Sequence, residues 1–300
     1  MEDTIKRLFK EFYHANAHLE LDKLVDLFAI FGGSQIPFEI DKTDSIEEII
    51  RFHFVENFKY IEDSISPSYL LEKPYSRFLT AVARGDGRVT NAFNRSRIGD
   101  GLGWKLIREL EELNIIFLEI SREKPLLTSK NQKLPKELRG YHIEPKIRFV
   151  APFMRFWFAF VAPFSKDLTH KQSSAFYENF ELHFTRLTGL LFEQLSIAML
   201  NQHFGNTLLS NGSYWDRHFN EFDVYAITKH SKSIVGECKY KNKKICKNEL
   251  SKLQEKAKVS ILSPEIYALF SKSGFSNELK SMKSDKLLLF ELDDLVSLIV

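Results

Sequence analysis

The sequence predicts a multidomain α+β protein: a helical N-terminal region and a winged helix-turn-helix module, followed by an α/β domain with a mixed sheet. Three observations support this fold class. Apolar residues recur at helical spacing over the first seventy positions, two short strands form a hairpin near position 230, and strands alternate with helices after it. A chain of 300 residues suits two or three domains, and its 44% hydrophobic share is sufficient for packed cores.

The helical region is expected to cover residues 1–70. Ile5 and Phe9 begin a series with helical spacing, and glycines near position 32 interrupt the helices. A further helix is expected after Ser45, because Ser45 and Glu48 have the spacing of a capping box.

The winged helix-turn-helix is expected over residues 71–164, with a long polar wing between its two strands. Its helices and strands are predicted at 75–83, 90–96, 104–113, 115–120 and 146–150. The third helix of such a module often reads DNA. Here it carries two basic and three acidic residues, so a scaffold or protein-docking role is preferred over DNA reading. The aromatic segment 153–158 is interpreted as core between domains, with a subunit contact as the alternative.

The α/β domain is expected over residues 165–300. A long helix or a pair of helices over 173–202 precedes a short strand at 207–209, and a glycine-containing segment then leads into the hairpin. The predicted elements that follow the hairpin are a helix at 247–259, a strand at 265–270, a helix at 276–282 and a strand at 286–291. This order predicts a mixed sheet flanked by helices.

The hairpin, with strands expected at 222–227 and 233–240, carries the residues that point to chemistry. Asp223 lies in its first strand, and period-two alternation places Glu237 and Lys239 on one face of its second strand. If Asp223 faces the same way, two carboxylates meet and repel each other unless a cation neutralises them. Mg²⁺ or Mn²⁺ suits such oxygen ligands, and the lysine would steady a phosphate or help to activate water.

Other residues of this segment have assigned places in the hypothesis. The thiol of Cys238 is expected on the opposite, buried face, while its backbone carbonyl completes the metal shell. Ten lysines against three glutamates between Lys229 and Lys258 give a basic rim, which is either a solvated face or a surface that attracts phosphates. The residues expected to follow a nucleic-acid backbone are Lys241, Lys243, Lys244 and Lys247.

Asp223 followed by Glu237-Cys238-Lys239 resembles the core motif of the PD-(D/E)xK nucleases, which have the restriction-endonuclease-like fold. That fold usually adds an acid from the preceding helix, and Glu193 is the matching residue, although a glutamate there is also compatible with a plain helix surface. The resemblance implies Mg²⁺- or Mn²⁺-dependent hydrolysis of phosphodiesters in DNA, with Asp223, Glu237, Lys239 and Glu193 as catalytic residues.

A wider resemblance covers nearly the whole chain. The chain resembles the C-terminal half of archaeal-type P-loop ATPases at segments 31–37, 148–158, 212–217 and 221–223 and at Gly236-Glu237-Cys238-Lys239. That half consists of a lid, a winged helix and a nuclease-like domain of unknown function. The sequence lacks a Gly-x-x-x-x-Gly-Lys-Ser/Thr loop, so no bound nucleotide and no ATPase activity are expected. The chain is then either a stand-alone derivative, weakly favoured by Met1, or a piece of a longer protein.

Two functional hypotheses follow from the sequence. The first is a metal-dependent DNA nuclease or a degraded relative of one, and the alternative is a non-catalytic DNA-binding or protein-docking subunit that keeps the fold as a platform. DNA is the expected partner, and a protein partner or a homo-oligomer stays open. Two cysteines and the lack of a signal peptide or an apolar span indicate a cytoplasmic protein with no membrane contact.

Overall fold

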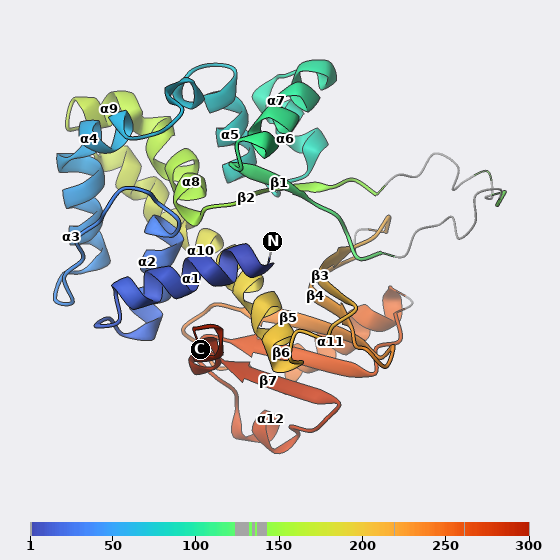
Figure 1. The fold of residues 1–300 in the computed structure, drawn as a ribbon. Coiled ribbons are helices and arrows are strands. Elements are labelled where there is room, and N and C mark those ends of the chain that lie inside the picture. Colours follow the sequence, from blue (N-terminus) through green and yellow to red (C-terminus); the bar gives the residue numbers. More distant parts are fainter. Residues whose placement is uncertain are drawn as a thin grey trace. The chain divides into compact units, whose positions relative to one another are not determined.

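The computed structural model describes residues 2–123, 132–133, 136, 143–218, 220–260 and 262–299 (Figure 1). The chain divides into two compact units. Unit 1 comprises the described residues up to Glu119 and Lys146–Leu191, with Ile299. Unit 2 comprises Phe192–Leu298 with the described residues between Ile120 and Pro145. The predicted winged-helix wing lies largely outside the described residues.

The first part of unit 1 is helical, as predicted. The helix expected after Ser45 begins there with a full capping box, in which Ser45 Oγ accepts from the Glu48 amide and Glu48 Oε2 accepts from the Ser45 amide. This helix continues as a π-helical turn up to Glu56. The elements are α1 (Glu2–Ala15), α2 (Leu21–Phe31), α3 (Ile46–Ile50), η1 (Arg51–Glu56), α4 (Phe58–Asp63) and η2 (Ser68–Leu71).

Three helices and an antiparallel strand pair follow, in the order typical of a winged helix. They are α5 (Tyr75–Arg84), α6 (Val89–Ser96), α7 (Asp100–Glu112), β1 (Ile116–Glu119) and β2 (Lys146–Phe149). Arg148 Nε donates to Glu119 Oε2 at 2.7 Å, which ties the two strands together.

The expected start of the third helix was wrong, because α7 begins at Asp100 rather than at Trp104. Gly99 is the N-cap of α7, and Gly101 and Gly103 lie inside its first turn. A Cβ on Gly103 would come within 2.3 Å of the Phe93 ring, so glycine allows α7 to approach α6 closely.

The aromatic segment forms core inside unit 1. It folds as α8 (Pro152–Phe156), η4 (Trp157–Val161), η5 (Ala162–Phe164) and α9 (Ser165–Thr169). Phe156 and Trp157 are fully buried, and Trp157 stacks on Phe58 with ring centroids 6.1 Å apart. The segment is therefore core within unit 1.

Unit 2 is built on a five-stranded mixed sheet, as the sequence predicts. The strand order is β3-β4-β5-β6-β7, with antiparallel pairing from β3 to β5 and parallel pairing from β5 to β7. The elements are α10 (Ser174–His203), whose C-terminal part lies in this unit, β3 (Ser210–Trp215), β4 (Glu221–Ile227), β5 (Ser233–Lys239), α11 (Lys247–Val259), β6 (Ile266–Ser271), α12 (Asn277–Ser281), β7 (Leu287–Glu291) and η6 (Leu292–Leu298).

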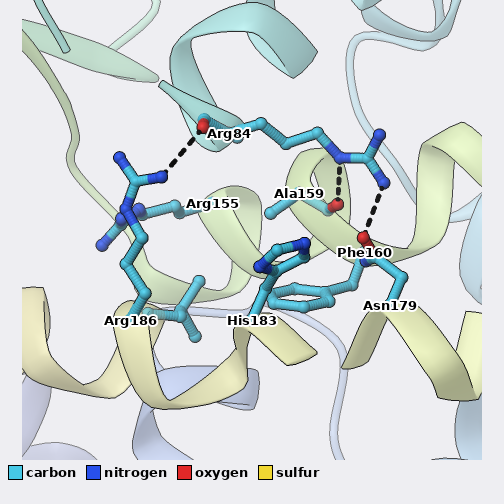
Figure 2. Close-up of a pocket in the computed structure, with 9 residues that line it drawn as sticks. Arg84, Arg155, Ala159, Phe160, Asn179, His183 and Arg186 are labelled. Carbon is cyan, nitrogen blue, oxygen red and sulfur yellow. Dashed lines mark hydrogen bonds between the residues drawn. The ribbon is translucent and has the colours of Figure 1, made fainter. Parts of the chain in front are cut away.

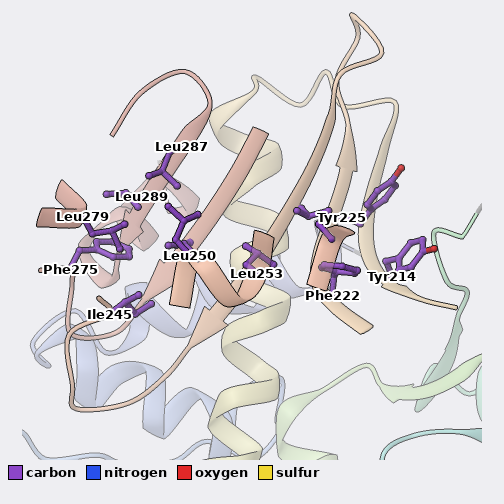
Figure 3. Packing of buried hydrophobic residues seen from close by; sticks show 13 residues of the cluster. Tyr214, Phe222, Tyr225, Ile245, Leu250, Leu253, Phe275, Leu279, Leu287 and Leu289 are labelled. Atoms are coloured by element: carbon purple, nitrogen blue, oxygen red, sulfur yellow. The ribbon is translucent and has the colours of Figure 1, made fainter. Parts of the chain in front are cut away.

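The core of unit 2 joins the sheet to α11. Leu250 and Leu253 of α11 point at the sheet, and Phe222 and Tyr225 of β4 meet them from the strand side (Figure 3). The other face carries Cys238, near the C-terminal part of α10, where Phe192 contacts Tyr240. Alternation along β5 therefore sends neighbouring side chains to two different helices.

The strand expected at 207–209 was wrong, because the first strand of the sheet is β3 at Ser210–Trp215. Asn211, Gly212 and Ser213 have low strand propensity. The segment is held by partners instead: the Arg122 amide donates to Ser213 O and Arg122 Nε donates to Asn211 O. A Cβ on Gly212 would come within 2.6 Å of Arg122 Nε, so this close approach requires glycine.

Gly236 sets how closely the central strands pack beside the hairpin motif. A Cβ there would lie 3.0 Å from both Ala268 O and the Val224 Cβ. We expect Gly236→Ala to reduce the free energy of unfolding by about 1–3 kcal/mol, as overpacked core positions do. Urea denaturation measures this change. Gly189→Ala is the control, because a Cβ there meets nothing within 4 Å, and equal effects of the two substitutions would contradict the prediction.

Candidate functional site

The site begins with an irregularity in β4. The β3–β4 register pairs Gly212 with Tyr225 and then Tyr214 with Phe222, so that Asp223 and Val224 together lie opposite Ser213. One extra residue on one strand is a β-bulge, which bends the strand and redirects a side chain, and bulges are frequent near active sites. The bulge therefore determines where the Asp223 side chain points.

The Asp223 carboxylate takes the place of a main-chain partner of β5. Its Oδ2 accepts a hydrogen bond from the Cys238 amide at 2.8 Å, just beyond the last ladder pair of the two strands, Val224 with Gly236. Asp223 keeps part of its surface exposed, although its carboxyl group is closely surrounded by protein. The carboxylate is thus held at the point where the β4–β5 ladder ends.

Asp223 lies within electrostatic range of two further carboxylates. Burial is the largest cause that raises its pKa well above the usual range, and the negative charges of Glu193 and Glu237 raise it further. The hydrogen bond from Cys238 and the charge of Lys256 act in the opposite direction but are outweighed. Asp223 thus lies in the electrostatic fields of the other two acids that the sequence singled out, Glu193 and Glu237.

Two lysines flank the Glu237 carboxylate. Lys239 Nζ donates to Glu237 Oε1 at 2.5 Å, and Lys256 Nζ lies 3.5 Å from Oε2 of the same group. The Glu237 side chain is 19% exposed and that of Lys239 is 28% exposed, so the cluster is open to solvent on one side. Burial alone would lower the pKa of Lys239, but its hydrogen bond to Glu237 and the nearby carboxylate charges raise it.

Lys256 is the site residue that sequence reasoning missed. Lys252, one turn earlier on the same helix, pairs with Glu249 instead. Lys256 lies next to the buried Ala257 on α11 and places its ammonium 4.8 Å from the centroid of the Phe222 ring. The available signal was the helical register, since Leu253 and Ala257 define the face of α11 that meets the sheet.

Cys238 and the lysine rim occupy different surroundings. The Cys238 thiol is buried, as expected, and burial together with the charge of Asp223 raises its pKa. The four rim lysines are exposed in the segment after β5, where Lys247 pairs with Glu278 at 3.0 Å. The rim residues are Lys241, Lys243, Lys244 and Lys247.

We call Glu193, Asp223, Glu237, Lys239 and Lys256 the carboxylate site. Its oxygen donors have the chemistry that a hard divalent cation prefers, and three carboxylates outnumber two ammonium groups. Within the described residues, however, no three His, Cys, Asp or Glu side chains are grouped as a metal site. A cation would therefore rest on Asp223 and Glu237 with main-chain or water oxygens, and Glu237 would have to share its charge with the lysines. Whether Cys238 supplies its carbonyl oxygen stays a prediction.

Residues 157–256 match the model of DUF234, a family described as archaeal and bacterial proteins of unknown function. This segment is one third of the chain and contains every residue of the carboxylate site. The comparisons with curated proteins and with solved structures give no significant match. In the described part of the chain, no helix is long and apolar enough to cross a membrane.

The raised pKa of Asp223 has a consequence for stability. Its folded-state pKa exceeds the unfolded value, so ionising Asp223 above that unfolded value costs folding free energy that grows until the folded pKa is passed. We expect Asp223→Asn to raise the Tm at pH 8 without added metal by about 2–4 °C, which corresponds to about 1 kcal/mol. The advantage should disappear near pH 4, where the unfolded-state carboxyl is itself half protonated. Calorimetry at a series of pH values measures this.

Asp285→Asn is the control for this measurement, because Asp285 is exposed and lies on the α12–β7 connection. Its Tm should follow that of the parent at every pH. A marked loss of stability in Asp223→Asn would instead mean that Asp223 serves mainly as a structural acceptor for the Cys238 amide.

Proposed function

We propose that unit 2 is a metal-dependent phosphodiesterase domain that acts on DNA, related in mechanism to the PD-(D/E)xK nucleases. The observation that supports this most is the Asp223 carboxyl, which lies in the fields of Glu193 and Glu237 beside Lys239. A carboxyl group whose pKa is raised by burial and by neighbouring negative charges is typical of a functional site. The order of acid on a helix, acid on one strand and Glu-x-Lys on the next agrees with the resemblance drawn from the sequence.

In this proposal the residues have separate tasks. Asp223 and Glu237 hold Mg²⁺ or Mn²⁺, which when bound supplies a water of lowered pKa and withdraws charge from the phosphate. Glu193 orients water at the site. Lys239 holds the Glu237 carboxylate in place and stabilises negative charge that develops on the phosphate. Exposed lysines of the rim attract the nucleic-acid backbone.

The wider relationship is part of the same proposal. We infer that the chain is related to the C-terminal half of archaeal-type P-loop ATPases. The helical first part, the three helices with a strand pair and the mixed sheet follow each other in the order of that half. The family match covers the segment that contains the acids.

A non-catalytic role is the second candidate, and a specific observation favours it. Both Glu237 oxygens lie near lysine ammonium groups, at 2.5 and 3.5 Å, so the carboxylate has positive partners without any metal ion. A subunit that binds DNA or a protein through this fold would keep such pairs. The two roles differ in whether a divalent cation displaces them.

Plasmid cleavage separates the two roles. We expect the parent to relax supercoiled DNA with Mg²⁺ or Mn²⁺ and to be inactive with EDTA. Glu237→Gln and Lys239→Ala should lower the rate by at least about 10²-fold, the usual effect of removing an acid–base or charge-stabilising group. Gel densitometry over time gives the rates.

Glu255→Gln is the matched control, because Glu255 is exposed on α11 next to Lys256 and pairs only weakly with Lys258, at 3.8 Å. It should cleave as the parent does. Equal cleavage by the parent and by Glu237→Gln would mean a contaminating nuclease and would favour the non-catalytic role.

A further inference from the structure

A small pocket in unit 1 has three arginines and a histidine among its nine lining residues. Its volume is about 160 Å³, and α5, η4 and α10 contribute to its wall. Figure 2 shows Arg155 and Arg186 on one side, the Arg84 guanidinium and Asn179 on the other, and His183 between them. Among the described residues that line this pocket, none is an aspartate or a glutamate.

Hydrogen bonds to neutral acceptors hold two of these arginines. Arg84 Nε donates to Ala159 O at 2.9 Å, and Arg84 Nη2 donates to Asn179 Oδ1 at 3.2 Å. Arg186 Nη2 donates to Gly85 O at 2.8 Å. Figure 2 shows the longer hydrogen bond of the same side chain, from Nη1 to Arg84 O at 3.4 Å. Such bonds orient the guanidinium groups without cancelling their charge, so the pocket is preorganised for an anion.

Asn179 adds a second observation. Its Oδ1 accepts from Arg84, which fixes the amide, and its Nδ2 is buried without a partner. A buried donor with no acceptor costs free energy, and such groups in native structures often mark functional sites. Burial also lowers the pKa of Arg84, as expected for a cation short of negative charge.

The size of the pocket limits the ligand. About 160 Å³ is the room of about five water molecules, and it is below the roughly 300–1,000 Å³ of pockets that enclose drug-sized ligands. A tetrahedral phosphoryl group fits this room, while a whole nucleotide does not. Guanidinium groups approaching from two sides favour a dianion over a carboxylate, whose single charge and flat shape one arginine satisfies.

We propose that this pocket binds a phosphomonoester group, with Arg84, Arg155, Arg186 and His183 as donors. This site goes beyond the phosphodiesterase proposal, because every residue of its wall lies in unit 1 and none belongs to the carboxylate site. The rest of the phosphorylated molecule lies outside the pocket.

An adjacent basic pocket offers a surface for that remainder. Its volume is about 570 Å³, and Arg84 lines both pockets. Lys73, Arg77 and Arg95 also line it, and Glu62 is the acid among its described lining residues. Arg84 therefore links the positive charge of the small pocket to that of the larger one. A ligand with further phosphates would require such a continuous positive surface.

The test measures binding to the whole chain by calorimetric titration at constant ionic strength. The probes are inorganic phosphate, a nucleoside 5′-monophosphate, and one oligonucleotide with either a 5′-phosphate or a 5′-hydroxyl end. EDTA is present throughout, so that the carboxylate site has no cation. We expect the phosphomonoester probes to bind the parent, and Arg186→Gln and Arg155→Gln each to weaken that binding at least about tenfold. Preference for the 5′-phosphorylated oligonucleotide identifies a nucleic-acid end as the source, and equal binding of the mononucleotide identifies a small molecule.

Arg51→Gln is the matched control, since Arg51 is exposed, lies outside both pockets and pairs with Glu56 at 3.6 Å. It removes the same charge and should bind as the parent does. Arg186→Lys should recover part of the affinity. Circular dichroism establishes whether each variant is folded. If Arg186→Gln is unfolded, the binding of the Arg155→Gln variant alone decides the test. Failure of every phosphomonoester to bind the parent, or unchanged binding in the Arg155→Gln variant, would overturn the proposal without touching the plasmid result.

Discussion

Repulsion of the enclosed Asp223 carboxyl by the neighbouring negative charges is the constraint around which the carboxylate site is organised. Asp223 is enclosed by protein and lies in the fields of Glu193 and Glu237, an arrangement that costs free energy unless charge is supplied or removed. A bulge places the Asp223 carboxylate where it accepts a hydrogen bond from the Cys238 amide. Lys239 and Lys256 neutralise part of the negative charge at Glu237. Both candidate roles, catalytic and non-catalytic, start from this balance and differ only in what supplies the remaining positive charge.

Unit 1 presents the opposite problem. Its small pocket is lined by arginines. The described hydrogen bonds of Arg84 and Arg186 go to neutral oxygens, so these bonds do not cancel the positive charge. The chain thus has the carboxylate site, which favours cations, in unit 2 and the small arginine-lined pocket, which favours anions, in unit 1. The two proposals use these charges separately, for attraction of phosphate in unit 1 and for chemistry at phosphate in unit 2.

Much of this could be predicted from the sequence, because the signals were local. The bounds of α11 match the helical pattern, and the hairpin strands differ from expectation by about one residue at their ends. What failed depended on distant partners. β3 pairs with β4 and is also held by Arg122 at Asn211 and Ser213. Lys256 reaches Glu237 from a helix whose position depends on packing against the sheet. The bulge at Asp223 is visible only in the register of two strands.

The placement of Lys256 bears on how sites of this kind are recognised. Its ammonium comes from α11, after the strand that carries Glu237 and Lys239, and it is steadied by the aromatic face of Phe222. A chain that has lost the lysine of the strand motif would still keep one cation against the glutamate. Pattern searches that demand Glu-x-Lys would pass over such a chain. A search that accepts the basic residue from the following helix, paired with a ring beside the strand aspartate, would find it.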